Sequence, residues 1–162
     1  YSAYQGKLVV NKVLSAPVSS CDLPIGRRYE FGADGKMLAA LIAQGIVPIV
    51  APLTHDGKGN MLNINADTMA AETAKALAPY YDVTLTYCFE FPGVMRNPED
   101  ETSVIPTINA ESFQALVADG TISGGMIPKI ENSLQAVNAG VKEVVITKAD
   151  AIDGTKGTKI TC

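Results

Sequence analysis

Two short segments hold groups that could bind and move an anion. Residues 63–67 read Asn-Ile-Asn-Ala-Asp and residues 124–129 read Gly-Gly-Met-Ile-Pro-Lys, each at the expected start of a helix. The second segment places Lys129 near a helix N-terminus, where partial positive charge disfavours a cation by a few tenths to about 1 kcal/mol. A bound anion removes this conflict, and helix N-termini behind flexible glycines are suited to bind one.

The first segment supplies complementary groups, the amides of Asn63 and Asn65 and the carboxylate of Asp67. An acid near a lysine at a phosphate-sized site indicates phosphoryl transfer, in which a protein mainly positions groups and stabilises charge. Simpler interpretations exist for each residue. Asn65 or Asp67 is expected to be a helix N-cap, and Lys129 taken alone could be a solvated lysine.

Composition describes an ordinary globular chain. Of the 162 residues, 47% are hydrophobic and 19% charged, which suffices for one domain with a core. The net charge of −4 argues against nucleic acid or an anionic membrane as the main partner. No apolar run reaches the roughly 18–20 residues that span a bilayer. The start, Tyr-Ser-Ala-Tyr, has no initiator Met or signal-peptide pattern, which predicts an excerpt of a longer chain or a processed one.

Cysteine and histidine usage argues against a metal centre and a catalytic triad. Cys21, Cys88 and Cys162 are scattered and odd in number, without a Cys-x-x-Cys spacing. Free thiols fit a cytoplasmic setting. The single histidine, His55, lies in a turn-rich stretch, so we do not expect it to be catalytic.

Hydrophobic periodicity predicts alternating strands and helices from residue 34 onward. Expected helices begin near residues 37, 66, 110 and 127, and the first, third and last of them end at Gly45, Gly120 and Gly140. Expected strands cover residues 46–53, 82–88, 141–147 and 158–160, and residues 7–13 and 27–31 are weaker candidates. The alternation predicts an α/β fold, a three-layer αβα sandwich with a mainly parallel central sheet. Ligands of such sheets bind at the carboxyl edge of the strands, and both polar segments open helices there.

The two segments, in their order and spacing, resemble the amino-acid kinase superfamily, and within it the acetylglutamate kinase family. The apolar run at residues 47–53 and the Gly-Thr-x-Ile sequence at residues 157–160 add to the resemblance. It covers residues 36–162 and implies the carbamate kinase-like fold, with the N-terminal part of the family's fold missing. Residues 36–162 would then be the nucleotide-binding kinase domain, and residues 1–35 a linking segment or a remnant of the acceptor domain.

The resemblance also implies roles for individual residues. Lys129 would neutralise the transferring phosphoryl group, and Asp67 would orient the reacting lysines. Asn63, with Asn65 beside it, would bind the acylglutamate. The backbone of Gly124, Gly125 and Met126 would contact the nucleotide phosphates, with Tyr87 and Cys88 nearby. The family usually has a Thr/Ser-Asp pair at that strand end, where this chain has Thr-Tyr-Cys-Phe-Glu over residues 86–90.

The implied reaction is transfer of the γ-phosphoryl group of ATP, with Mg²⁺, to the side-chain carboxylate of an N-acylglutamate in arginine biosynthesis. The acyl group could be acetyl or succinyl. A homo-oligomer is implied for the complete enzyme. Two alternatives stay open: a nucleotide-binding fragment without turnover, and another amino-acid kinase acting on carbamate, aspartate or a nucleoside monophosphate.

Overall fold

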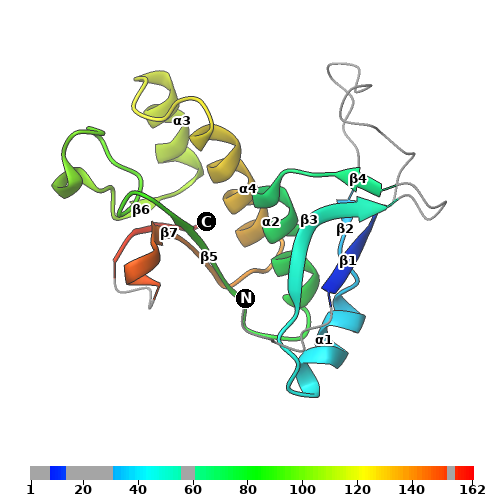
Figure 1. Cartoon of the computed structure of the whole chain (residues 1–162). Coiled ribbons are helices and arrows are strands. Elements are labelled where there is room, and N and C mark those ends of the chain that lie inside the picture. Colours follow the sequence, from blue (N-terminus) through cyan, green and yellow to red (C-terminus); the bar gives the residue numbers. More distant parts are fainter. Residues whose placement is uncertain (1–7, 14–30, 56–60, 153–155) are drawn as a thin grey trace. The chain divides into compact units, whose positions relative to one another are not determined.

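A computed structural model describes residues 8–13, 31–55, 61–152 and 156–162 (Figure 1). The chain divides into two compact units, Tyr1–Tyr80 and Tyr81–Cys162, which we call unit 1 and unit 2 and describe separately. The expected division into residues 1–35, a linking segment or acceptor-domain remnant, and residues 36–162, a nucleotide-binding domain, stays a prediction.

Unit 1 contains a mixed sheet with the strand order β2-β1-β3-β4. Its strands are β1 (Leu8–Val13), β2 (Phe31–Gly32), β3 (Ile49–His55) and β4 (Met61–Asn63). β1 and β3 run parallel, and the two short strands are antiparallel to their neighbours. The expected strand at residues 46–53 begins only at Ile49 because Pro48, which has no N–H to donate, lies before it. The extended piece expected at residues 27–31 lies outside the described residues except for Phe31.

Two helices of unit 1 pack against each other, α1 (Gly35–Ala43) and α2 (Ala66–Leu77). The Asp34 side chain accepts a hydrogen bond from the Met37 amide at 2.9 Å and caps α1. Gly35 lets the helices approach closely, since a Cβ there would lie 2.1 Å from the carbonyl oxygen of Ala76. Leu38 of α1 is fully buried, so this helix pair forms part of the core of unit 1.

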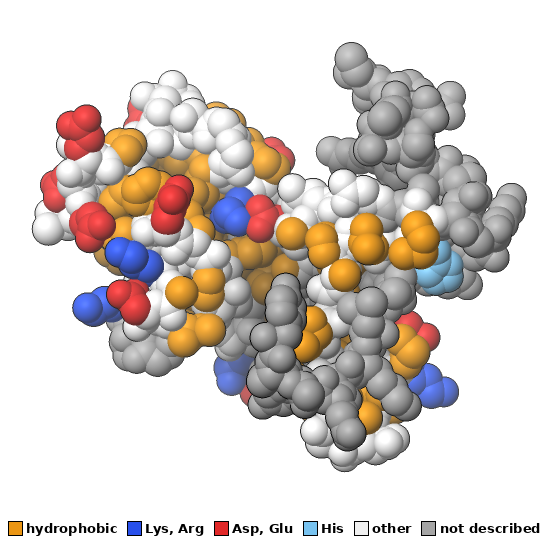
Figure 2. All heavy atoms as spheres, in the orientation of Figure 1, with side chains coloured by type: hydrophobic (Ala, Val, Ile, Leu, Met, Phe, Trp, Pro, Cys, Tyr) orange, Lys and Arg blue, Asp and Glu red, His pale blue; other side chains and the backbone are white. Residues whose placement is uncertain are grey.

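Unit 1 also exposes large apolar side chains on its sheet side. Val47, Ile49 and Met61 are 61%, 57% and 60% exposed. Figure 2 shows a row of apolar side chains that ends beside His55, coloured pale blue. A patch of this kind is typical of a surface that contacts another protein surface.

Unit 2 contains the sheet β5-β7-β8-β6. Its strands are β5 (Thr84–Phe89), β6 (Thr107–Ile108), β7 (Glu143–Lys148) and β8 (Thr158–Ile160). β5 and β7 are parallel over their whole length, β8 is antiparallel to β7, and β6 is parallel to β8. Four successive residues of β7, from Val144 to Thr147, are buried, as expected for a strand covered on both faces.

Helices α3 (Ala110–Ala118) and α4 (Met126–Asn138) belong to unit 2. Asn109 and Ser112 form a reciprocal capping box at the start of α3, as their spacing permits. α4 contacts β7 and β8. Because α4 ends at Asn138 and β7 begins at Glu143, the N-terminus of α4 lies at the edge where β5 and β7 end. The short 3₁₀ helices η1 (Glu101–Ser103) and η2 (Ala149–Ala151) complete the unit.

The predicted α/β class is confirmed, and the longest pairings, β1 with β3 and β5 with β7, are parallel as expected. The helices expected from residues 37, 66, 110 and 127 are all present. Within the described ranges, no helix has the length and apolar character needed to cross a bilayer.

Candidate active site

The N-terminus of α4 presents open backbone. Gly125 is its N-cap in a helical conformation (φ −67°, ψ −13°), without a side chain that caps the helix. Gly124 before it has φ +56°, a left-handed conformation that favours glycine. A Cβ on either glycine would meet no atom within 4 Å among the described residues. The amides of Met126 and Ile127 reach carbonyl oxygens only at 3.3 Å. This end of the helix can therefore accept an anion from solvent.

Lys129 and Tyr87, both predicted site residues, come together in unit 2. The Lys129 Nζ lies 4.7 Å from the centroid of the Tyr87 ring, within the range of a cation–π interaction. Lys129 is on α4, half-buried, and Tyr87 is on β5, where only 5% of it is exposed. Because α4 begins at Met126, Lys129 is the fourth residue of the helix rather than its first.

Cys88 has a different environment from Tyr87. Successive residues of a strand point to opposite faces, so Cys88 faces away from the side on which Tyr87 meets Lys129. It is exposed, and its thiol is free. Its predicted place near the nucleotide stays a prediction.

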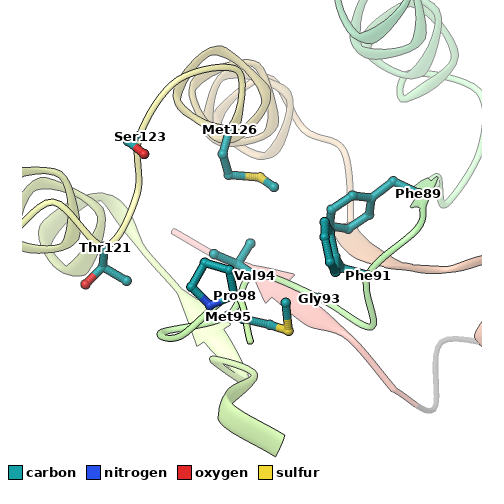
Figure 3. A pocket seen from close by; sticks show the side chains of 9 residues that line it. All are labelled: Phe89, Phe91, Gly93, Val94, Met95, Pro98, Thr121, Ser123 and Met126. Atoms are coloured by element: carbon teal, nitrogen blue, oxygen red, sulfur yellow. The ribbon is translucent and has the colours of Figure 1, made fainter. Parts of the chain in front are cut away.

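A hollow of about 140 Å³ lies beside the start of α4 within unit 2. Figure 3 shows Met126 pointing from α4 toward it, with two phenylalanines on one side and Thr121 and Ser123 on the other. The walls come from the end of β5 and the loop after it, and from the loop before α4 and the first residue of that helix: Phe89, Phe91, Gly93, Val94, Met95, Pro98, Thr121, Ser123 and Met126. Among the residues predicted from sequence, only Met126 contributes to this lining.

The aromatic wall was not anticipated. Phe89 and Phe91 meet edge to face, with centroids 5.7 Å apart and planes at 70°. The sequence signal was available, since apolar residues directly after the carboxyl end of a parallel strand are placed where ligands bind. The segment from the end of β5 to Pro98 thus lines a cavity.

A threonine on β8 anchors the part of the lining at Val94. The Thr158 hydroxyl on β8 accepts a hydrogen bond from the Val94 amide at 2.8 Å and donates one to the Ile105 carbonyl at 2.7 Å. Gly93 is needed here, because a Cβ would lie 2.8 Å from a methyl of Val104 and 2.9 Å from the Thr158 hydroxyl. The loop is therefore attached to the sheet through a buried side chain.

One carboxylate near the hollow has a shifted pKa. Asp119 accepts a hydrogen bond from the Thr121 amide at 2.9 Å. Hydrogen bonds from the Thr121 side chain and amide lower the pKa of Asp119 below 3.8, and the charge of Arg96 adds a smaller lowering. The negative form of Asp119 is thus favoured by the turn at Thr121, a residue that lines the hollow.

The other predicted residues lie at the β4–α2 junction of unit 1. Asn65 is the N-cap of α2, and its side chain accepts a hydrogen bond from the Thr68 amide at 3.1 Å. Asn65 is therefore the N-cap, and Asp67, the other candidate, is not. Asp67 lies in the first turn of α2, where a negative charge is favourable. Asn63 ends β4 and is exposed. Asp67 and Lys129 belong to different units. That Asp67 orients Lys129 therefore stays a prediction.

Comparison with known proteins defines the class. The profile of the Amino acid kinase family matches residues 11–148. The chain belongs to the amino acid kinase family. Among solved structures, smu.665 of Streptococcus mutans is similar over 96% of this chain and 60% of its own, with a TM-score of 0.74 and 27% identity. Carbamate kinase of Giardia lamblia shares the fold with a TM-score of 0.65 over 95% of this chain and 60% of its own, at 21% identity.

The curated relatives are more specific. The chain is 62% identical over 127 residues to the acetylglutamate kinase of Bacteroides thetaiotaomicron, covering 78% of this chain and 49% of that protein. It is 53% identical over 145 residues to that of Parabacteroides distasonis, covering 89% and 56%. The predicted resemblance to acetylglutamate kinases is confirmed. The chain spans about half the length of the curated relatives it matches.

Proposed function

We propose that the complete protein transfers the γ-phosphoryl group of ATP to the side-chain carboxylate of N-acetyl-L-glutamate, or of N-succinylglutamate, as a step of arginine biosynthesis. The observation that carries this proposal is the open start of α4, with two exposed glycines, followed in its first turn by Lys129. The identity of 62% to an acetylglutamate kinase supports the choice of acceptor.

The mechanism requires alignment and charge stabilisation rather than a base. The acceptor carboxylate is already ionised at neutral pH, so it can attack the γ-phosphorus directly, and ADP leaves with the bonding electron pair. Backbone amides at Gly124, Gly125 and Met126 bind the phosphates. Lys129 stabilises the negative charge that develops on the transferring group. Asn63 and Asn65 bind the acceptor. Asp67 orients the reacting lysines, of which Lys129 is one.

Mg²⁺ would enter with the nucleotide. The described residues contain no group of three or more His, Cys, Asp or Glu side chains close enough to hold a metal ion. We propose that the cation would be held mainly by phosphate oxygens and water, as is usual for Mg²⁺. Its role is to shield the phosphate charge.

Steady-state kinetics on the full-length protein tests this proposal, with the acyl phosphate trapped as a hydroxamate. Lys129→Ala should lower kcat about 10²–10³-fold, or about 3–4 kcal/mol, with a smaller effect on ATP binding. Lys129→Arg should not restore the rate fully, because a planar guanidinium differs from a compact ammonium. Lys142→Ala is the matched control, since Lys142 pairs with exposed Asp82 at 3.0 Å. Near-normal kcat in Lys129→Ala would contradict the mechanism.

The alternative of a nucleotide-binding fragment without turnover applies to this chain alone. This chain covers 49% of the Bacteroides thetaiotaomicron relative. The open start of α4, which we propose binds the nucleotide phosphates, lies within this chain. We expect calorimetry to detect weak MgADP binding by this chain and the hydroxamate assay to detect no turnover. Absence of binding by a folded sample would exclude the alternative. The second alternative, another amino-acid kinase, is tested by measuring phosphoryl transfer to carbamate, aspartate and a nucleoside monophosphate with the full-length protein.

We also propose a cytoplasmic homo-oligomer. The exposed apolar side chains of unit 1, such as Val47 and Ile49, support a contact between subunits. Light scattering of the full-length protein would measure its mass, and a strict monomer at micromolar concentration would contradict this part of the proposal. The free thiols of Cys88 and Cys162 fit a reducing compartment.

A further inference from the structure

We propose that Tyr87 is a positioning residue, whose ring face holds the ammonium of Lys129 where the transferring phosphoryl group needs it. This inference rests on the proposed function for the role of Lys129. Its structural basis is independent of that function, because it starts from the observed stack of 4.7 Å between Nζ and the ring centroid.

Lys129 needs such a support for two reasons. Its ammonium terminates a flexible side chain with four rotatable bonds, so the charge is not fixed by the backbone. It also lies in the first turn of α4, where the positive end of the helix disfavours a cation. The negative face of an aromatic ring offsets this repulsion.

Tyr87 is suited to provide that face. It is 5% exposed and belongs to β5, which pairs with buried β7 along six residues. The ring is therefore held by the sheet rather than by a loop. Residues on strands place functional groups more precisely than residues on loops.

The ring acts on Lys129 through attraction without adding a charge of its own. An aromatic face attracts an ammonium through its quadrupole and carries no net charge. The stack at 4.7 Å therefore orients the Lys129 ammonium without itself neutralising it.

The first test measures the stack itself in the full-length protein. Ring currents shift protons above an aromatic face upfield, so the ε-methylene protons of Lys129 should resonate upfield of those of Lys142. The shift should persist in Tyr87→Phe and disappear in Tyr87→Leu. Lys142, paired with Asp82, is the internal reference. A Lys129 resonance at the Lys142 position in the unsubstituted protein would overturn the proposal.

The second test measures the consequence in the full-length protein. Phenylalanine and its mono-, di- and trifluorinated forms are introduced at position 87, which weakens the ring quadrupole stepwise while the packing is kept. We expect kcat to fall in steps by a total of about two- to thirtyfold, with a smaller change in the KM for ATP. Equal melting temperatures along the series confirm that the fold is intact.

The two possible failures can be distinguished. A series in which fluorination leaves kcat unchanged would overturn the role of Tyr87 while the unsubstituted protein remains a kinase. Absence of turnover by the unsubstituted protein with every acceptor would instead refute the proposed function. Equal effects on kcat in the fluorinated series and in a fluorinated Phe113 series would also overturn the role of Tyr87, because Phe113 lies on α3 and is absent from the lining of the hollow.

Discussion

Gly125→Ala should separate what the fold requires at the start of α4 from what a ligand requires. Gly125 has φ −67° and ψ −13°, which alanine adopts readily, and a Cβ would meet no described atom within 4 Å. Alanine restricts the unfolded chain and so adds about 0.4–1 kcal/mol of stability. Alanine is a poorer N-cap than glycine by a similar amount. The net change in the free energy of unfolding should therefore lie within about 1 kcal/mol of zero.

Nucleotide binding should respond differently. A phosphate oxygen must come within about 2.9 Å of a backbone nitrogen to accept its hydrogen bond. A methyl group on Gly125 occupies the space from which that oxygen approaches. We expect the Kd for MgADP to rise at least tenfold, or about 1.4 kcal/mol, measured by calorimetry.

Gly120→Ala is the matched control. Gly120 has φ +81° with nothing near its Cβ position, and it ends α3 outside the hollow. Alanine there should cost about 1–2 kcal/mol of stability through its left-handed backbone and leave the Kd unchanged. Unchanged MgADP binding by folded Gly125→Ala would refute the reasoning, since the phosphates could not then dock on this backbone.

Three further expectations follow from the packing, the caps and the charges. Gly35→Ala should lower the free energy of unfolding by about 1–3 kcal/mol in urea denaturation, because its Cβ would lie 2.1 Å from the Ala76 oxygen. Asn109→Ala should cost about 1 kcal/mol in the same assay by removing the capping box of α3, with exposed Gln114→Ala as the control. The carboxyl carbon of Asp119, followed by NMR, should titrate with a pKa below 3.8 that rises toward 3.8 in Thr121→Val. Because the folded pKa is lowered, this carboxylate stabilises the fold above pH 3.8, and the contribution is lost as the pH falls through the folded pKa.

Each of these expectations has a contradicting result. Native stability of Gly35→Ala would mean that α1 and α2 can separate without cost. Equal stabilities of Asn109→Ala and Gln114→Ala would show that solvent replaces the cap. An Asp119 pKa that does not change in Thr121→Val would contradict the role of the hydroxyl and assign the lowering to the backbone amide of residue 121, which valine retains, and to Arg96.

The strands and helices could be predicted largely because their signals are local. Periodicity located α4, and glycines with positive φ, such as Gly45 and Gly140, end helices where expected. Strand boundaries were less accurate, since β3 begins only after Pro48. These features depend on neighbours within one helical turn or on a single special residue.

The site could be predicted only in part because it depends on long-range contacts. The open start of α4 could be inferred from its glycines. The Lys129–Tyr87 stack joins residues 42 positions apart in the sequence, and no periodicity relates them. The same holds for the hydrogen bonds of Thr158, whose partners lie 64 and 53 positions earlier. Such contacts are set by the strand order, which the sequence pattern alone does not determine.

The strand order of unit 2 has a consequence for the order of synthesis. β7 is made before β8, and until Thr158–Ile160 exist, one edge of the most buried strand is open to pairing with other chains. The cavity wall at Val94 also requires these three residues, because the Val94 amide donates its hydrogen bond to Thr158. A growing chain therefore contains every residue of α4 before the wall of the hollow beside that helix can be completed. Protection from aggregation and completion of the cavity wall thus come in one late step, the addition of a three-residue strand.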